Sequence, residues 1–539
     1  MRARRFVAVT LFAIGMLVAA RLLRNALGGG DAVARGLFDE VLAHVERNYV
    51  DPLDAADLYR KAARGMVAEL HDPNSAVLDE ARLRALQETT AGEYDGVGVQ
   101  VDVRGGWLSV IAPVAGGPAE QAGLRSGDRI LEVDGRSVSA RLAEDARSGL
   151  RGPPGTKVTL LVERPGVVAH FPIVITRAAI HVSAVRHAFL LAPRVGYAQL
   201  SLFADSSARE LRLAVNRLRT EGARAMVLDL RADPGGLLTE GVQVADEFLD
   251  PGQAVVTLRG RGDRVTQTFT ARAAQPWPDL LLLVLVDGGT ASAAEIVAGA
   301  LQDHDRAVVL GATTYGKGSA QTIIPLENER EALRLTTALW FTPSGRSIQR
   351  PHAAPGDTAA PRDSLAERPL ASRRAYRTAS GRVVYGGGGI TPDLIVASQD
   401  SIDGTPALLR ALGKELPRFR DAVVDEAAAA RASAAGAGPV IVTIFPAMRE
   451  SLWRRARARG VTMGRAPYDS AAAAVDRMLA DEIAREARGA EAAYRQRVAQ
   501  DRVVQAALAL ADGAATERAL LARAAERRAA HREDVSRAP

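Results

Sequence analysis

The sequence predicts a multidomain α/β protein. A chain of 539 residues is longer than a single hydrophobic core usually organises, so several structural units are expected. From about Val195 onward, buried-strand patterns alternate with amphipathic-helix patterns, which is typical of an α/β core with short crossovers. A β-rich stretch with many glycines precedes this core, and a helical stretch rich in Ala and Arg follows it.

The N-terminus predicts export from the cytoplasm. Arg2, Arg4 and Arg5 precede an apolar run from Phe6 to Ala20, which is the layout of a signal sequence. As a helix this run rises only about 22 Å, short of the roughly 30 Å hydrocarbon core, although snorkelling arginines extend its reach. Because no clear cleavage site precedes the glycine linker that ends segment 1–30, an uncleaved signal anchor is favoured over a cleaved signal peptide. A buried core helix is the remaining alternative.

Changes of pattern predict the domain boundaries. Residues 31–93 carry apolar side chains at helical spacing and predict a small helical unit. Residues 94–180 change to β-branched alternation with glycine-rich turns, which predicts a compact β module. The α/β core is expected over 181–400, with a mobile insertion at 351–380, where periodicity is lost. A helical C-terminal extension is expected over 401–539.

Composition excludes several classes of function. The net charge of +6 is modest for this length, and no basic stripe interleaved with aromatic residues predicts nucleic-acid binding. The absence of cysteine excludes disulfides, thiol nucleophiles and Cys-ligated metals. Only four of the 69 basic residues are lysines and the others are arginines, so any lysine is an exception to the strong preference of this chain for arginine.

A serine stands where a buried strand gives way to a helix. Such a junction exposes a side chain and aims main-chain N–H groups at a developing anion, as acyl transfer requires. Ser292 is therefore a candidate nucleophile. Ser292 with Glu295 three residues later is also a capping box, which needs no chemistry, and from this segment alone that alternative is the stronger.

Lys317 is the candidate general base. It follows Ser292 by 25 residues, with one predicted helix and one predicted strand between them, which is the length of chain that returns to the same sheet edge. As a base its amine must be neutral, so burial must lower its pKa well below about 10.4, which arginine does not permit. None of the eight histidines lies in a recognisable triad setting. The alternative is a surface lysine in a turn.

Two further elements complete the candidate site. Gln321 shares a face with Lys317 if one helical turn connects them, but lies about 13 Å away along a strand, and the sequence leaves both possibilities open. Gly235 and Gly236 follow a buried strand, and one of them, together with the N–H of Ala293, offers donors for an oxyanion hole. Most isolated Pro-Gly-Gly segments are only turns.

Together these segments resemble the carboxyl-terminal processing peptidases, the S41 family of serine proteases. Thr-Ala-Ser-Ala-Ala-Glu-Ile-Val-Ala-Gly-Ala-Leu-Gln-Asp at 290–303 is similar to the family's nucleophile motif, and Tyr-Gly-Lys-Gly-Ser-Ala-Gln at 315–321 to its lysine motif. Segments 230–238 and 387–394 are similar to its Pro-Gly-Gly and Gly-Ile-x-Pro-Asp signatures. The resemblance runs from about residue 38 to residue 396.

The resemblance implies an α/β-spiral core of the crotonase/Clp-like kind. It implies that Ser292 is the nucleophile, Lys317 the base and Gln321 the residue that orients the lysine. Asp303 matches an aspartate implicated in some members, but it lies about 16 Å along the helix from Ser292, which favours an architectural role. Thr290 stands where a serine is common. Such a Ser-Lys dyad needs no metal or organic cofactor, so none is expected.

The β module resembles a PDZ domain. Tyr-Asp-Gly-Val-Gly-Val-Gln-Val, which begins at Tyr94, is similar to a PDZ carboxylate-binding loop. The implied peptide-binding residues are Gly96, Val97, Gly98 and Val99. Such a loop offers N–H groups to a C-terminal carboxylate while the peptide adds a strand to the sheet edge. The alternative is a β module that serves only as a hinge.

The expected function is a serine endopeptidase that cleaves exported proteins near their C-termini after the PDZ domain has captured them. The expected location is the cell envelope, periplasmic or extracytoplasmic, with an inner-membrane anchor. Expected partners are unfolded or C-terminally exposed substrates, the membrane through the N-terminal segment, and a second copy in a homodimer. The alternatives are a catalytically silent PDZ scaffold of the envelope and a crotonase-like acyl-CoA enzyme, for which no acyl-CoA site is found.

Overall fold

The computed structural model divides the chain into two compact units. It describes residues 29–104, 107–125, 127–138, 148–164, 167–327, 330–350, 373–399, 403–430 and 442–537. One unit consists of the described residues up to Glu80 together with Gln321–Thr336, and the other of Ala81–Ala320 and the chain from Thr337 onward. Nearly all of the predicted signal segment and most of the predicted insertion at 351–380 lie outside the described residues. No helix in the described ranges is long and apolar enough to span a membrane.

The first unit is built from helices α2 (Gly29–Asn48) and α3 (Ala55–Ala68) and from strands β1 (Ala76–Leu78), β17 (Ser319–Pro325) and β18 (Ala332–Phe341). Strands β17 and β18 belong to it only in part, since the unit boundaries cut both. After α3 the carboxylate of Asp72 accepts hydrogen bonds from the N–H of Asn74 and the hydroxyl of Ser75, which turns the chain. Strand β1 then pairs antiparallel with β18, with Ala76 opposite Arg334.

A six-stranded sheet is the centre of the second unit. Its order is β10 (Val185–Ala192), β11 (Val195–Leu200), β12 (Ala225–Asp229), β15 (Leu281–Val286), β16 (Val308–Gly311) and β21 (Leu394–Ile395). Strand β10 runs antiparallel to β11, and the other neighbours are parallel. Every residue of β12, β15 and β16 is buried, as expected for parallel strands covered on both faces. The predicted alternation of strands and helices is confirmed.

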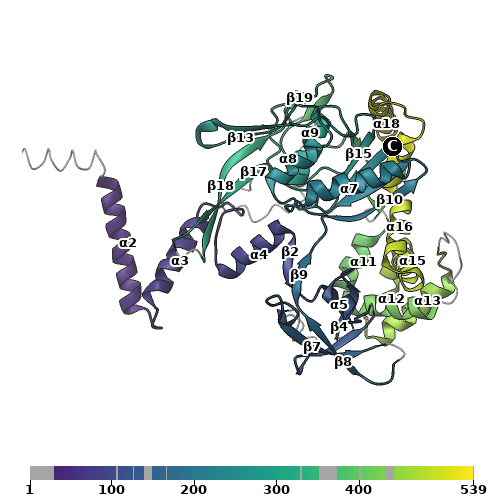
Figure 1. The fold of residues 1–539 in the computed structure, drawn as a ribbon, viewed down its shortest axis with the longest axis horizontal. Helices are drawn as coiled ribbons and strands as arrows, with labels where there is room; N and C mark the ends of the chain where they lie inside the picture. Colours follow the sequence, from purple (N-terminus) through teal and green to yellow (C-terminus); the bar gives the residue numbers. More distant parts are fainter. Residues whose placement is uncertain are drawn as a thin grey trace, which may run out of the picture. The chain divides into compact units, whose positions relative to one another are not determined.

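Helices from two distant parts of the chain cover the two faces of this sheet. On one face, α7 (Ser207–Thr220), α8 (Leu238–Asp246) and α9 (Ala293–Asp303) pack in one hydrophobic core with alternate strand residues such as Leu228 and Val284. On the other face, Val227 and Leu283 pack in a second core with α17 (Arg502–Ala511) and α18 (Glu517–Arg537) (Figure 1). The end of the C-terminal extension is therefore a layer of the core.

The rest of the extension has a hydrophobic core of its own. It comprises α11 (Thr405–Leu412), α12 (Leu416–Ala430), α13 (Pro446–Ala458), α14 (Arg465–Ser470) and α15 (Ala472–Arg488), and α16 (Ala490–Gln500) leads from it to the sheet. Phe419, Leu452 and Leu479 are fully buried among these helices. The C-terminal region is helical, as the sequence predicts.

The β module follows α4 (Glu80–Ala91) and is joined to the core by two paired strands, β2 (Glu93–Gly96) and β9 (Ala178–His181). Between them lie β3 (Val99–Arg104), β4 (Trp107–Pro113), α5 (Pro118–Gln121), β5 (Arg129–Val133), β6 (Arg136–Ser137), β7 (Lys157–Glu163) and β8 (Phe171–Thr176). Leu108, Ile130 and Leu160 are fully buried at its centre. Two hairpins complete the second unit: β13 (Ala254–Arg259) with β14 (Val265–Thr270), and β19 (Ala375–Arg377) with β20 (Val383–Tyr385).

Candidate active site

Ser292 lies at the sharp turn between β15 and α9. It is the N-cap residue of α9, is half-buried, and has φ 56° and ψ −116°. Residues other than glycine rarely adopt a positive φ, because this backbone conformation is strained. Such strain is common at functional sites, including nucleophilic serines on strand-to-helix turns. The flanking residues Ala291 and Ala293 are small, which leaves room for a substrate.

Asp287 joins the turn before Ser292 to the turn that follows β12. Its Oδ1 accepts hydrogen bonds from the N–H groups of Gly289 at 2.9 Å and Thr290 at 3.1 Å. The same oxygen accepts from the N–H of Ala232 at 2.9 Å. One carboxylate thus holds together the two turns that carry the nucleophile and the glycine pair.

Glu295 brings the two halves of the predicted dyad to a single carboxylate. Its Oε2 accepts hydrogen bonds from the N–H of Ser292 at 2.8 Å and from the N–H of Lys317 at 2.9 Å. Its Oε1 accepts from the N–H of Gly316 at 2.7 Å and from the hydroxyl of Thr314. Burial raises the pKa of Glu295, while these hydrogen bonds act to lower it. The lysine segment is therefore fastened to the first turn of α9.

The sequence indicates Glu295 only as the partner of Ser292 in a capping box. The hydrogen bond from the N–H of Ser292 to its carboxylate is present, so the capping geometry is real. Its bonds to the lysine segment were missed. A signal was available, because Glu295 is a carboxylate within a helix whose other residues are mostly apolar, and buried carboxylates need several donors.

Lys317 follows β16 and is half-buried. Glycine is needed on either side of Lys317, because backbone atoms of neighbouring segments lie too close for a Cβ atom. A Cβ on Gly316, which has φ +87°, would lie 3.0 Å from the N atom of Gly389, and a Cβ on Gly318 would lie 2.8 Å from the N atom of Gln349. The lysine is thus held on backbone that is packed on both sides.

Gln321 lies on β17, so a helical turn does not connect it to Lys317. Its Nε2 donates a hydrogen bond to the hydroxyl of Thr336 on β18 at 3.1 Å. The strand alternative of the sequence analysis therefore holds for this residue. Its role in orienting Lys317 stays a prediction.

The glycine pair after β12 packs directly against the candidate nucleophile. Gly235 has φ +88°, and a Cβ there would lie 2.7 Å from the carbonyl oxygen of Ala291 and 2.8 Å from both the N atom of Ala293 and the Cβ of Ser292. A Cβ on Gly236 would lie 2.1 Å from the carbonyl oxygen of Phe203. No larger residue fits at either position without moving the turn.

The two glycines differ in what their N–H groups do. The N–H of Gly235 donates to Oδ1 of Asp233 at 2.8 Å, so the predicted oxyanion donor at this position is already in use. Phe203 and Gly236 form a parallel β-bridge: the N–H of Phe203 donates to the carbonyl of Gly235, and the N–H of Leu237 donates to the carbonyl of Phe203. In this arrangement the N–H of Gly236 points away from Phe203. Within the described ranges neither this N–H nor that of Ala293, in the first turn of α9, has an acceptor.

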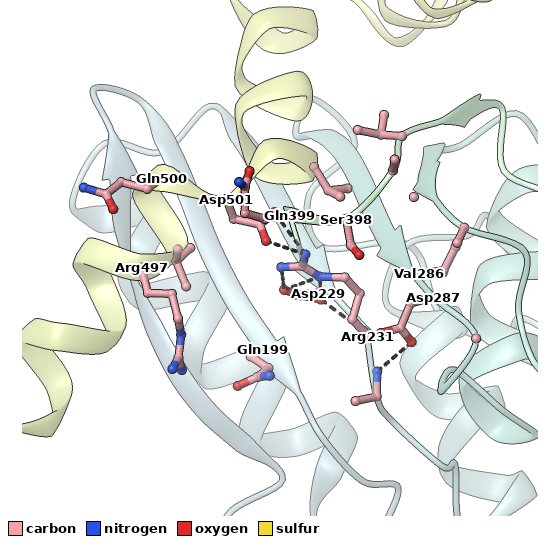
Figure 2. A pocket seen from close by; sticks show the side chains of 18 of the residues that line it. Gln199, Asp229, Arg231, Val286, Asp287, Ser398, Gln399, Arg497, Gln500 and Asp501 are labelled. Carbon is pink, nitrogen blue, oxygen red and sulfur yellow. Dashed lines mark hydrogen bonds and ion pairs between the residues drawn. The ribbon is translucent and has the colours of Figure 1, made fainter. Parts of the chain in front are cut away.

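A cavity of about 610 Å³ lies at the carboxyl ends of the parallel strands, beside these turns (Figure 2). In open α/β sheets this edge is where ligands bind. The guanidinium of Arg231 lines the cavity between two carboxylates, as Figure 2 shows. It donates to Asp229 at 2.7–3.1 Å and to both oxygens of Asp501 at 3.0 and 2.9 Å. Its pKa is raised: burial acts to lower it, but the two carboxylates outweigh burial.

Sequence reasoning missed this ion network. Its signal was Asp229, a carboxylate at the end of an otherwise apolar strand, followed two residues later by Arg231. The hydroxyl of Tyr197 donates to Asp229 at 2.8 Å and contacts the hydroxyl of Tyr494 at the same distance. The partners Tyr494 and Asp501 belong to the C-terminal helices, which nothing in the sequence connects to this strand.

Asp303, at the other end of α9, is part of a separate buried network. It forms an ion pair with Arg346 at 2.7 Å and accepts hydrogen bonds from the hydroxyl of Thr342 and the N–H of Ser344. These contacts fit the architectural role that the sequence favours. Within the described ranges no group of three or more His, Asp or Glu side chains is arranged to hold a metal ion.

The four predicted peptide-binding residues lie at the junction of β2 and β3. Val97, Gly98 and Val99 line a cavity of about 230 Å³, together with Tyr94 and Arg151. The guanidinium of Arg151 lies 4.9 Å from the centre of the Tyr94 ring. Gly96 ends β2, and the N–H of Val97 donates to the carbonyl of Leu150 at 3.2 Å. The N–H of Val97 is therefore in use within the module.

Two protein-family models match parts of this sequence. The model of peptidase family S41 matches residues 194–356, and a PDZ domain model matches residues 109–164. Among solved structures, the photosystem II D1 C-terminal processing protease is similar, with 31% sequence identity, a TM-score of 0.36, and coverage of 58% of this chain and 89% of that one.

Curated relatives are similar over a large part of their length. The carboxy-terminal-processing protease of Bartonella bacilliformis is 39% identical over 316 residues, which is 58% of this chain and 72% of the relative. The carboxyl-terminal-processing protease of Synechocystis is 35% identical over 352 residues, 63% of this chain and 80% of the relative. The carboxy-terminal processing protease CtpA of Bacillus subtilis is 32% identical, with 57% and 65% covered. The chain belongs to peptidase family S41 and is a C-terminal processing serine protease with a PDZ domain.

Proposed function

We propose that Ser292 is the nucleophile of this protease and Lys317 its general base. The observation that carries the proposal is the shared carboxylate of Glu295, which accepts from the main-chain N–H groups of both residues. A dyad requires its two members to keep a fixed separation, and one buried acceptor on both backbones supplies that constraint. The strained backbone of Ser292 supports the same assignment.

The proposed oxyanion hole consists of the N–H groups of Gly236 and Ala293. Both are without an acceptor in the described part of the chain, whereas the N–H of Gly235 is bound to Asp233. The close contact of Gly235 with Ser292 and Ala293 brings the turn next to the position of the scissile carbonyl.

In the proposed reaction the neutral amine of Lys317 takes the hydroxyl proton of Ser292 as its oxygen attacks the scissile carbonyl. The two N–H groups stabilise the oxyanion, and the lysine ammonium then gives its proton to the leaving amine. Water, activated in the same way, hydrolyses the acyl-enzyme and regenerates Ser292. Gln321 is proposed to orient the lysine. These steps account for every proton without a metal or an organic cofactor.

The substrates are proposed to be exported proteins with an exposed C-terminus, which the PDZ domain captures before cleavage near that end. The cavity beside Gly98 and Val99 supports this proposal, because Arg151, whose guanidinium is ion-paired with Glu88, is among the residues that line it. We place the enzyme in the cell envelope, extracytoplasmic, anchored through its N-terminal apolar segment and acting as a homodimer. The arginine-flanked apolar run from Phe6 to Ala20 is the basis for that location.

Cleavage of an unfolded protein with an apolar C-terminus tests the dyad. We expect Ser292→Ala and Lys317→Ala each to lower kcat/KM by about a thousandfold or more. Ser206→Ala is a matched control, because Ser206 is the N-cap residue of α7, and Lys414→Ala controls for removal of a lysine. Both controls should cleave like wild type. Cleavage by Ser292→Ala at the wild-type rate would show that the dyad is assigned wrongly.

Capture is tested separately, with fluorescent peptides that carry a free or an amidated C-terminus. The free peptide should bind to the wild-type protein and lose about tenfold in affinity with Arg151→Gln, since one charged contact contributes roughly 1.4 kcal/mol. The amidated peptide should bind weakly to both proteins. Equal binding of the two peptides would contradict carboxylate recognition by the PDZ domain.

A further inference from the structure

Asp233 is a buried carboxyl group that the proposed reaction does not use. It lies in the turn between β12 and the glycine pair and is fully buried, with 0% of its surface exposed. Its Oδ1 accepts a single hydrogen bond, from the N–H of Gly235 at 2.8 Å. Its Oδ2 is buried and has no hydrogen-bond partner in the described part of the chain. An ionised carboxylate with one partner is unusual in a buried site, because charge without compensating donors is costly there.

Among the residues that the structure describes, no cation is paired with this carboxyl group. The charged side chains nearest in the chain to the segments around the turn include those of Asp205, Asp229, Arg231, Glu240, Asp287, Glu295 and Lys317. None of them is hydrogen-bonded or ion-paired to Asp233 in the described structure. The guanidinium of Arg231 is bound to Asp229 and Asp501. Burial therefore raises the pKa of Asp233 to about 8, and only the Gly235 N–H acts to lower it.

The position of Asp233 makes its charge relevant to catalysis. Its main-chain carbonyl accepts from the N–H of Ala291, the residue before Ser292, at 2.9 Å. Its side chain binds Gly235, which is packed against Ser292. Asp233 is therefore hydrogen-bonded to both backbone segments that border the proposed oxyanion hole, at Ala291 and at Gly235.

We propose that Asp233 is a positioning residue of the oxyanion turn that acts as a neutral carboxylic acid, and that its ionisation switches hydrolysis off. This inference rests on the proposed function of Ser292. In the neutral form the carbonyl oxygen of Asp233 accepts from Gly235 and holds the turn. In the ionised form, a negative charge in a site shielded from water opposes the negative charge that develops on the substrate oxygen.

The pH dependence of hydrolysis tests the proposal. Wild type should lose kcat on the alkaline side with a midpoint near the pKa of about 8. The loss should be at least tenfold, and KM should change little, because the repulsion grows only as the oxyanion forms. Asp233→Asn keeps an oxygen that accepts from Gly235 but does not ionise, so its kcat should stay high up to pH 10. Asp246→Asn, at the end of α8, is the control and should keep the wild-type profile.

Two outcomes would overturn the inference: a wild-type kcat with no alkaline fall, or the same fall in Asp233→Asn. Melting temperatures and circular dichroism at each pH separate inactivation from unfolding. Should the Asn variant fail to fold, Asp233→Ser is a second uncharged variant that offers an oxygen acceptor, and its kcat should also lack the alkaline fall.

Ser292→Ala, assayed at pH 7, distinguishes this inference from the proposed function. If Ser292→Ala cleaves like wild type, the proposed function fails. If it is inactive while Asp233→Asn has the wild-type profile, only the role of Asp233 is wrong.

Discussion

The guanidinium of Arg231 donates to both carboxylate oxygens of Asp501, at 3.0 and 2.9 Å. Arg231 immediately precedes the turn that holds the glycine pair, whereas Asp501 is the N-cap residue of α17 near the end of the chain. The ion pair therefore fastens the C-terminal helices to the backbone beside the proposed oxyanion hole. Since α17 and α18 also cover one face of the sheet, this part of the extension supports the site directly.

Loss of this ion pair should reduce both activity and stability. Asp501→Asn keeps an oxygen that caps α17 through the N–H of Val504 but removes the charge that faces Arg231. We expect kcat to fall about tenfold and the unfolding free energy to fall by about 1–3 kcal/mol, as for a charged hydrogen bond that is partly buried. Asp476→Asn, which removes the ion pair with Arg449 in the separate helical core, should leave kcat unchanged. Equal kcat in wild type and Asp501→Asn would contradict the link.

Replacement of Glu295 should impair both folding and catalysis. In Glu295→Gln one of the two oxygens becomes an NH₂ group, which faces N–H donors in place of accepting from them. We expect a loss of about 2–4 kcal/mol in unfolding free energy and at least a hundredfold loss in kcat, because the Ser292 and Lys317 segments lose their common acceptor. Glu426→Gln is a matched control, since Glu426 is also buried and pairs with Arg455. Its kcat should be normal, and a normal kcat in Glu295→Gln would refute the role of the shared carboxylate.

A methyl group on Gly235 should abolish activity. The Cβ of Gly235→Ala would come within 2.7–2.8 Å of the backbone around Ser292, so the turn must shift away from the nucleophile. Kinetic assays should show less than about 1% of wild-type kcat/KM. Gly222→Ala is the control: Gly222 also has a positive φ, +106°, but nothing lies within 4 Å of its Cβ position. It should lose only about 1 kcal/mol of stability and keep its activity.

Asp233 should make the folded protein less stable as the pH rises. Its pKa is raised to about 8 in the folded state, against about 3.9 in an unfolded chain, so the folded state binds more protons between these values. Stability should therefore fall from about pH 4 to pH 8 and change no further from this group above pH 8. Asp233→Asn lacks this loss and should exceed wild type by about 2–5 kcal/mol at pH 9 but by little at pH 4. Denaturant unfolding at both pH values measures the difference, and equal differences would contradict a raised pKa.

Much of the site follows from local sequence. Ser292 stands at a strand-to-helix junction, Lys317 lies between two glycines in a chain with few lysines, and the glycine pair follows a buried strand. Each of these signals depends on residues that are neighbours along the chain, and the structure has each of these local features at the predicted position. Gln321 illustrates the limit: its relation to Lys317 depended on whether the segment is a strand or a helix, which four residues do not decide.

The sequence alone was enough to predict the alternation of strands and helices in the α/β core, the candidate dyad and the β module, because periodicity, turn residues and caps are properties of adjacent residues. The tertiary structure decided how these parts are fastened: that Glu295 serves both Ser292 and Lys317, that Asp233 occupies the N–H of Gly235, and that the last helices cover the sheet. Such contacts join residues that are far apart in the chain, such as Arg231 and Asp501, which are 270 positions apart. They arise only when apolar faces pack and bury polar groups, which then take hydrogen-bond partners from distant parts of the chain.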